Sequence, residues 1–154
     1  MQVKESYEKL KKQYPQLPDF AVLDREFEIS DIEAEQHLLS HIKKKICEHV
    51  EAVHELLEEL LQPEPTSFGN LYEAKSFGEK DREQILEVYK KVILLLRELD
   101  ETILLLDENA DVALIKKTVQ IWPNLRKSVL PFVQKLKDCW TKPAGARKFF
   151  DYMG

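Results

Sequence analysis

The sequence predicts an all-α protein, a bundle of about five or six helices built on a long antiparallel helical hairpin. Two long stretches, residues 31–62 and 78–108, place apolar residues every three or four positions, which is the period of an amphipathic helix. Only four glycines occur in 154 residues, too few for a β protein in which many tight turns join short strands. We expect one domain, residues 1–154, with its own hydrophobic core.

Two short helices are expected before the hairpin. Residues 3–14 read VKESYEKLKKQY and predict the first of them. Residues 18–29 read PDFAVLDREFEI, in which Phe20, Leu23 and Phe27 fit helical spacing whereas Phe27 and Ile29 alternate as in a strand. We expect a short helix here as well.

The first long helix has signals at both ends. Ser30 and Glu33 form a capping box, which predicts a start near Asp31, and Pro63 follows the expected end. Between them runs one apolar stripe, made of Leu39, Ile42, Ile46, Val50, Val53, Leu57 and Leu60.

Residues 63–80 are the only extended loop candidate, and the second long helix follows them. Ser76 and Glu79 look like a second capping box, which predicts a start between Phe77 and Asp81. The apolar stripe of this helix is Ile85, Val88, Val92, Leu95, Leu99, Ile103 and Leu106.

Leu94 and Leu105 widen the apolar surface of the second long helix. They lie eleven residues apart, which is three turns, on a face that is otherwise charged. A helix that is apolar over so much of its circumference is usually central in a bundle or shared with another subunit. We therefore expect Leu94 and Leu105 to be a self-association surface, so that a homodimer is one expected state.

The last third of the chain predicts two further helices. The first begins at an Asn109 or Asp111 cap and is interrupted by Pro123. The second covers residues 124–140, and Pro131 is expected to kink it because proline removes one backbone hydrogen bond and clashes with the preceding turn.

The charge of the chain is divided unevenly. The net charge is −5, but residues 1–108 hold 14 Lys and Arg against 25 Asp and Glu, whereas residues 109–154 hold 9 against 3. Such asymmetry is typical of a partner-binding segment. The alternative is that the basic end packs against the acidic remainder of the same chain.

The basic end also carries aromatic residues, and together they are the candidate binding residues. These are Lys116, Lys117, Arg126, Lys127, Lys135, Lys137, Trp140, Lys142, Arg147, Lys148, Phe149, Phe150 and Tyr152. Cations and aromatic rings suit docking onto an acidic protein surface. The same residue types suit phosphates and stacked bases of nucleic acid. A third reading is that the final aromatics cover the open end of the bundle.

Patterns for catalysis are weak. Glu51 and His54 match the E-x-x-H spacing of di-iron carboxylate bundles, but that chemistry needs a second copy and none occurs. No glycine-rich phosphate loop is present, and Ser40 and His41 are neighbours that do not face each other on a helix. We expect no metal and no cofactor, and a metal-dependent all-α enzyme is the least favoured alternative.

The N-terminus lacks the apolar core of a signal peptide, and the longest apolar runs are far below the ~20 residues that span a bilayer. Cys47 and Cys139 are two thiols without a pattern, as expected in a reducing compartment. The sequence therefore predicts a soluble cytoplasmic protein without a membrane partner. Its leading function is a non-catalytic protein-interaction or assembly module, and the alternative is a nucleic-acid-binding accessory subunit.

Overall fold

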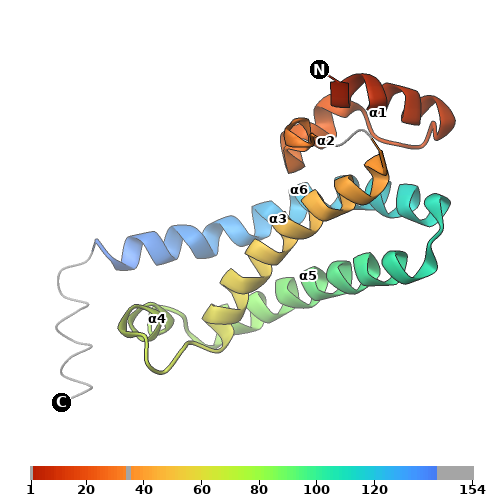
Figure 1. Ribbon diagram of the computed structural model, residues 1–154. Coiled ribbons are helices and arrows are strands. Elements are labelled where there is room, and N and C mark those ends of the chain that lie inside the picture. The colour runs from red at the N-terminus through yellow and green to blue at the C-terminus, as the bar shows by residue number, and fades with distance from the viewer. Residues whose placement is uncertain (1, 34–35, 142–154) are drawn as a thin grey trace, which may run out of the picture. The chain divides into compact units, whose positions relative to one another are not determined.

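The computed structural model describes residues 2–33 and 36–141, and it confirms the all-α prediction. Six α-helices occur in this part of the chain, with no strand among them. They are α1 (Gln2–Gln13), α2 (Phe20–Phe27), α3 (Leu38–Leu61), α4 (Phe68–Ala74), α5 (Glu79–Leu105) and α6 (Glu108–Cys139), with a 3₁₀ turn, η1 (Ile29–Asp31), after α2 (Figure 1).

The chain divides into two compact units. Unit 1 consists of Met1–Ala52 and Ile93–Asn124, and unit 2 consists of Val53–Val92 and Leu125–Gly154. The helices α3, α5 and α6 contribute residues to both units, whereas α1, α2 and η1 belong to unit 1 and α4 belongs to unit 2. Whether the whole chain behaves as the one domain expected from its length stays a prediction.

The predicted antiparallel hairpin is formed by α3 and α5. In unit 1 the Lys43 ammonium of α3 donates to the Thr102 hydroxyl of α5, and in unit 2 the His54 ring lies 3.2 Å from the Tyr89 hydroxyl. Because residue numbers fall along α5 as they rise along α3, the two helices run in opposite directions.

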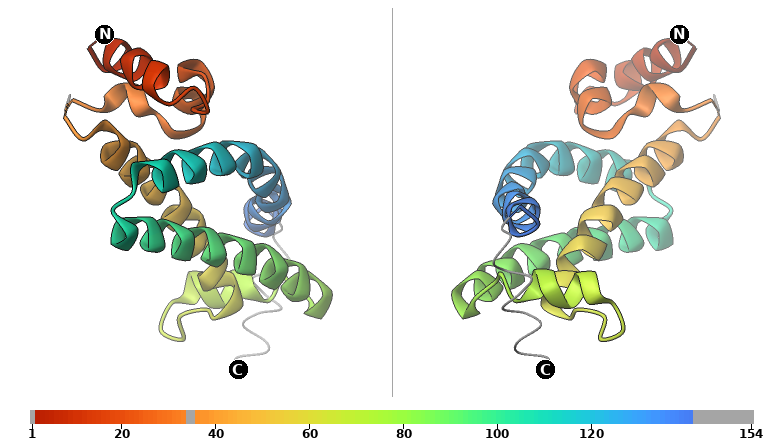
Figure 2. Two further views of the ribbon diagram at one scale, coloured as in Figure 1. Left: turned by 90° about the vertical axis from the view of Figure 1, so that its right-hand side faces the viewer. Right: turned by 90° about the vertical axis from the view of Figure 1, so that its left-hand side faces the viewer.

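The helices α5 and α6 are also antiparallel. Lys117 of α6 binds Glu98 of α5 at 2.7 Å in unit 1, and Lys135 binds Asp81 at 2.6 Å in unit 2. Their short connection, at Leu106 and Asp107, can be followed in both views of Figure 2.

Most of the predicted stripes form the core. On α3 all stripe residues are buried except Val53, which is half-buried. The α5 stripe is buried as far as Leu99, whereas Ile103 and Leu106, the residue after the helix, are 58% and 90% exposed. The prediction that these two residues continue the core was wrong.

The start of α3 also differs from the prediction. The helix begins at Leu38 rather than near Asp31, and residues 29–31 form a 3₁₀ turn instead. The backbone N–H of Ser30 donates to the Asp24 carboxylate at 2.7 Å, and Ile29 and Ile32 are buried. Burial of these isoleucines in unit 1 competes with the local capping signal and prevails over it.

The loop expected at residues 63–80 contains a helix of its own, α4. The Ser67 hydroxyl caps it by accepting a hydrogen bond from the Asn70 N–H at 3.2 Å. The next helix, α5, begins within the predicted range, but its cap is not Ser76: the Gly78 N–H donates to the Asp81 carboxylate at 3.1 Å. An acidic residue at the third helical position thus satisfies the first free N–H.

The two helices predicted in the last third of the chain are one continuous helix, α6, so the predicted interruption at Pro123 was wrong. The Asp107 carboxylate, rather than Asn109 or Asp111, caps the helix by accepting the Asn109 N–H at 3.0 Å. Proline removes one backbone bond, but Trp122, the residue before Pro123, is buried. Its ring packs against the Phe27 ring in unit 1, with ring centres 5.7 Å apart, which supports the helix up to the proline.

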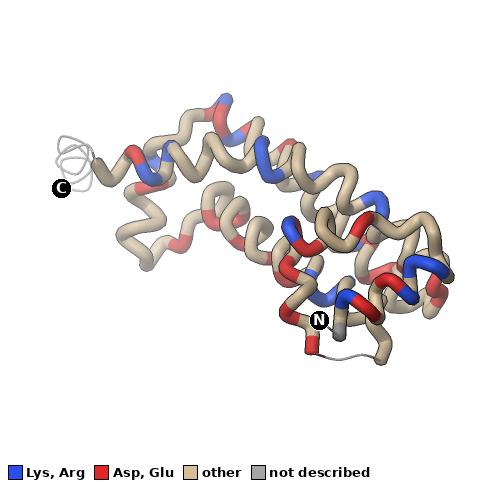
Figure 3. Tube along the Cα trace, turned by 90° about the horizontal axis from the view of Figure 1, so that it is seen from above, with Lys and Arg blue, Asp and Glu red and all other residues tan. Residues whose placement is uncertain are grey.

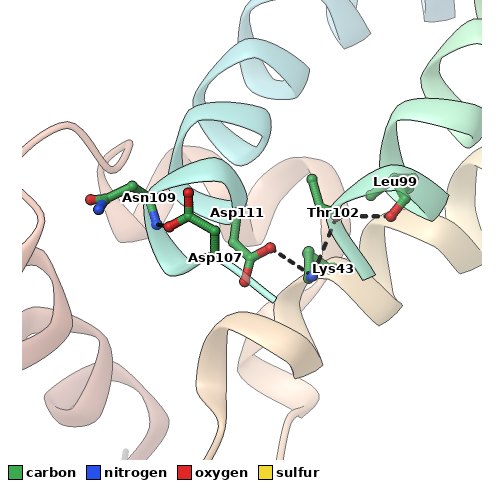
Figure 4. Close-up of polar contacts among 6 residues, drawn as sticks. All are labelled: Lys43, Leu99, Thr102, Asp107, Asn109 and Asp111. Carbon is green, nitrogen blue, oxygen red and sulfur yellow. Dashed lines mark hydrogen bonds and ion pairs between the residues drawn. The ribbon is translucent and has the colours of Figure 1, made fainter. Parts of the chain in front are cut away.

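A buried ion pair joins three helices in unit 1. The Lys43 ammonium of α3 lies 2.7 Å from the Asp111 carboxylate of α6 and 3.3 Å from the Thr102 hydroxyl of α5 (Figure 4). That hydroxyl donates in turn to the Leu99 carbonyl at 2.8 Å. Both charged side chains are only 10% exposed, so each needs the other to offset its lost hydration.

We predict that Lys43→Met destabilises the protein by about 3 kcal/mol or more, because it leaves the Asp111 carboxylate buried without a counter-ion. Urea unfolding followed by circular dichroism measures the loss. The double variant Lys43→Met/Asp111→Leu should recover much of it. Lys90→Met, at an exposed pair with Glu87, is the matched control and should change stability by about 0.5 kcal/mol or less. Equal effects at both lysines would contradict the role assigned to the buried pair.

Pro131 allows a test of the continuous α6. The residue is exposed within the helix, and proline is disfavoured relative to alanine by about 3 kcal/mol in a helix interior. Because alanine supplies the backbone N–H that proline lacks and has no ring to clash with the preceding turn, we expect Pro131→Ala to raise the free energy of unfolding by about 1 kcal/mol or more. Gln134→Ala, at another exposed α6 position, should be nearly neutral. A loss of stability at position 131 would mean that the ring makes a contact that alanine cannot replace.

Candidate interaction surfaces

The predicted binding residues of the basic end lie in different parts of the structure. Lys142, Arg147, Lys148, Phe149, Phe150 and Tyr152 lie outside the described residues. Lys116 and Lys117 belong to unit 1, whereas Arg126, Lys127, Lys135, Lys137 and Trp140 belong to unit 2. The positions of Lys and Arg along the described chain are marked in Figure 3.

Two of these cations are engaged with α5. The Lys117 ammonium contacts both oxygens of the Glu98 carboxylate, at 2.9 and 2.7 Å. The Lys135 ammonium binds Asp81 and lies 5.2 Å from the centre of the Phe77 ring. The hydrogen bond from Lys135, with a second from the Gly78 N–H, lowers the pKa of the Asp81 carboxyl. These two lysines already pair with α5 and are less available to a partner.

Four residues of α6 in unit 2 form an exposed stripe that we call the basic strip: Arg126, Leu130, Val133 and Lys137. Their spacing of four, three and four residues places them on one side of the helix. Leu130 is 52% exposed and Val133 40% exposed, and both cations are exposed. The strip therefore offers an apolar centre with a positive charge at each end.

An aromatic cluster joins α4 to the end of α6 in unit 2. The Trp140 ring lies 4.6 Å from the Tyr72 ring, and its indole N–H donates to Glu73 at 2.8 Å. Phe68 also stacks on Tyr72, with ring centres 6.0 Å apart. Trp140 and Phe68 remain about half exposed, at 51% and 45%. This cluster was not predicted, because residues 63–80 were expected to form a loop, although the i, i+4 spacing of Phe68 and Tyr72 indicates one face of a helix.

An exposed apolar feature of unit 1 lies at the end of α5. The four consecutive residues Ile103, Leu104, Leu105 and Leu106, here named the apolar tip, are 58%, 83%, 55% and 90% exposed. At about 100° per residue Ile103, Leu104 and Leu105 point to different sides of α5, and Leu106 follows the last residue of the helix, so the core of unit 1 does not cover them. Leu106 has φ 55°, the left-handed conformation that glycine usually adopts after a helix.

The sequence predicts only part of this feature. It placed Leu94 and Leu105 on the outer face of α5, and both are exposed, at 58% and 55%. It assigned Ile103 and Leu106 to the core because their spacing continues the stripe. Four apolar residues stand directly before the Asp107 cap of α6. This run indicates that α5 ends there with apolar side chains that no other element covers.

The apolar tip is surrounded by negative charge. Glu101, Asp107 and Glu108 are exposed around it, and the last turn of α5 contains no basic residue. The Tyr14 hydroxyl of α1 donates to the Glu108 carboxylate, and this hydrogen bond raises the pKa of Tyr14. We name Glu101, Asp107 and Glu108 the acidic rim.

Cys47 does not have the environment of a nucleophile. Its thiol donates to the Glu51 carboxylate, and burial, followed by that hydrogen bond and the nearby negative charges, raises its pKa to about 11. The thiol is therefore protonated at neutral pH. Cys139 is buried, and its thiol donates to the Leu136 carbonyl at 3.0 Å.

The histidines are dispersed along α3 and the residue before it. His37 is exposed, whereas His41 is half-buried. His49 packs edge-on against Phe27, and His54 stacks on the Tyr89 ring. Within the described ranges, no group of three or more His, Cys, Asp or Glu is arranged to hold a metal ion.

Unit 1 also contains an open polar hollow of about 380 Å³ among α1, the start of α3 and the start of α6. Lys9, His37, Glu108 and Asp111 are among its lining residues, so it presents both signs of charge. Its two carboxylates already accept hydrogen bonds from Tyr14 and Lys43. The hollow therefore presents no set of unpaired groups that would select one ligand.

No protein family model, curated protein or solved structure matches this chain. Across the described residues, no helix has both the length and the apolar character needed to cross a bilayer.

We predict that Cys47 is alkylated by iodoacetamide at least about tenfold more slowly than an unperturbed thiol at pH 8, because its thiolate forms only as the pH approaches 11. Site-resolved mass spectrometry separates it from Cys139. Glu51→Gln should accelerate the reaction by removing the hydrogen-bonded charge. Glu55→Gln, at an exposed position one helical turn further along α3, should leave the rate unchanged. Fast alkylation of the unmodified protein would contradict the protected environment of this thiol.

Proposed function

We propose that this protein is a non-catalytic protein-interaction module that binds its partner through the apolar tip of unit 1. The observation that supports this proposal is the exposure of four consecutive apolar side chains, each by more than half. Single exposed apolar residues are normal on a protein surface, but a contiguous group is typical of an interaction site. Burial of one such side chain stabilises a complex by about 1.5 to 3 kcal/mol.

The position of the tip supports a binding role. Thr102 immediately precedes it and Asp111 follows it by five residues, and both are buried in the network with Lys43. The tip therefore projects from a base that is fixed on both sides. A fixed anchor loses less conformational entropy on binding than a flexible one, which favours affinity.

The basic strip and the aromatic cluster of unit 2 supply a second docking surface in this proposal. Their exposed cations and half-exposed rings agree with a protein partner that carries an acidic face. We further infer that the module works in a reducing compartment such as the cytoplasm, because both cysteines are free thiols. The nucleic-acid alternative stays a prediction that the basic C-terminal residues support.

Quantitative affinity purification with a matched pair of variants tests the proposed function. Leu104→Ser/Leu106→Asn removes the two most exposed side chains of the tip. Asparagine tolerates the left-handed backbone at position 106, so we expect the melting temperature to stay equal or to rise. Leu86→Ser, at a 41% exposed position of α5 in unit 2, is the control.

We expect the unmodified protein and the Leu86→Ser control to retain the same partners, and the tip variant to lose at least one of them by roughly tenfold or more, which corresponds to about 1.4 kcal/mol. Copies of the chain itself count as partners in this measurement. If all three proteins retain the same set in equal amounts, the apolar tip is not a binding surface and the proposal fails.

A further inference from the structure

We propose that the aromatic cluster of unit 2 binds an arginine side chain of the partner protein, which stacks on the Trp140 indole and pairs with the Glu73 carboxylate. This inference deepens the proposed function at its second docking surface, and it rests on that function for the presence of a protein partner. The basic strip keeps its acidic contact, whereas Glu73 gives the aromatic cluster a preference for a cation.

The Trp140 ring is covered by Tyr72 on one side and open elsewhere. The centres of the two rings are 4.6 Å apart, and their planes are inclined by 33°. Tyr72 is buried, at 6% exposure, whereas Trp140 is 51% exposed, so the exposed part of the indole lies away from Tyr72. The face of an aromatic ring is electron-rich and attracts cations, and tryptophan forms the strongest contact of this kind. The open side of Trp140 is therefore suited to a cation.

The Glu73 carboxylate adds a full negative charge at the edge of the same ring. One of its oxygens accepts the indole N–H of Trp140 at 2.8 Å. In the part of the chain that the structure describes, no Lys or Arg pairs with Glu73, so its charge is not compensated. The side chain is half-buried, which reduces the screening of this charge by water. A ligand that is cationic and also donates hydrogen bonds satisfies both the ring and the carboxylate.

The charged neighbours of the cluster do not reverse this preference. Lys137 and Asp138 are both exposed at the end of α6, and their opposite charges offset each other. Lys75 follows Glu73 by two residues, and side chains with that spacing do not face each other on a helix. Glu73 therefore remains the charged group that is held against the indole.

A single open ring face beside a carboxylate favours arginine over other cations. The guanidinium group is planar and weakly hydrated, so it stacks on an aromatic face, and its N–H groups form a fork that matches a carboxylate. A lysine ammonium is a compact and strongly hydrated point charge, which gains less from the ring. A quaternary ammonium is bound in a cage of several rings, and here Tyr72 occupies one side of the indole.

The aromatic cluster is fixed before a partner binds. The Tyr72 hydroxyl donates to the Cys139 carbonyl at 3.2 Å, which joins α4 to the end of α6 directly before Trp140. Phe68 stacks on the same tyrosine. A ring that is already held in place loses little conformational freedom on binding, which favours affinity.

NMR of the indole N–H groups of the full chain tests the proposal with short blocked peptides. The probe is acetyl-Gly-Arg-Gly-amide, and the matched control contains citrulline, which has nearly the shape of arginine but no charge. A lysine peptide is the third ligand. The chain contains two tryptophans, and Trp122 is buried, so its signal is an internal reference for that of Trp140.

We expect the arginine peptide to shift the Trp140 signal and to leave the Trp122 signal unchanged. It should bind roughly tenfold more tightly than the citrulline peptide, because only arginine offers a cation to the ring and the carboxylate. The lysine peptide should bind with intermediate affinity. Equal binding of the three peptides would overturn the inference, and so would an arginine peptide that leaves the Trp140 signal in place.

Glu73→Gln separates the role of the charge from that of the ring. Glutamine can still accept the indole N–H, so the position of Trp140 is preserved while the charge is removed. We expect this variant to bind the arginine peptide roughly threefold to fivefold more weakly. Glu83→Gln, at an exposed position of α5 in unit 2, is the matched control and should leave binding unchanged. Equal affinity in both variants would contradict the ion pair with Glu73.

Failure of this inference can be distinguished from failure of the proposed function. The peptide titration reports on the aromatic cluster of unit 2, whereas the tip variant Leu104→Ser/Leu106→Asn changes only unit 1. If the tip variant loses a partner while the arginine peptide does not bind at Trp140, the proposed function stands and this inference alone fails.

Discussion

The arrangement of unit 1 depends on the buried ion pair between Lys43 and Asp111. A buried charge without a partner is strongly destabilising, so α6 must bring Asp111 to Lys43, and α5 must bring Thr102 to the same ammonium. These two contacts fix Thr102 as the last buried residue of α5 and Asp111 as the first buried residue of α6. The intervening residues have no core to enter, because the chain must turn between two positions that are already fixed. The exposed apolar tip is thus a geometric consequence of satisfying one lysine.

The helices themselves could be predicted from the sequence because their apolar period is local and strong, as in the α3 residues from Ile42 to Leu60. Their ends could not, because ends depend on contacts with other elements. Ser30 had the pattern of a helix cap, but its N–H bonds to Asp24 and the burial of Ile29 holds a 3₁₀ turn. Pro123 looked like a stop, but neighbouring residues are packed in the core. In each case tertiary burial prevails over a local preference.

The candidate surfaces were predictable to a smaller extent. A helical wheel places Leu94 and Leu105 outside, since position on a wheel follows from spacing alone. It cannot show that Lys117 and Lys135 are bound by carboxylates 19 and 54 residues earlier in the chain. Nor can it show that the apolar stripe of α5 continues beyond the core, as it does at Ile103. Such facts depend on which helices meet and at which register.

The acidic rim has a further consequence for the behaviour of the protein in solution. A run of consecutive isoleucine and leucine residues that stays exposed after folding is equally exposed while the chain is being made and whenever it unfolds. Charged residues that flank such a run act as gatekeepers against aggregation. Glu101, Asp107 and Glu108 stand in these flanking positions, and their repulsion keeps identical apolar runs apart. The same three carboxylates therefore oppose aggregation through the exposed run from the time the chain is made.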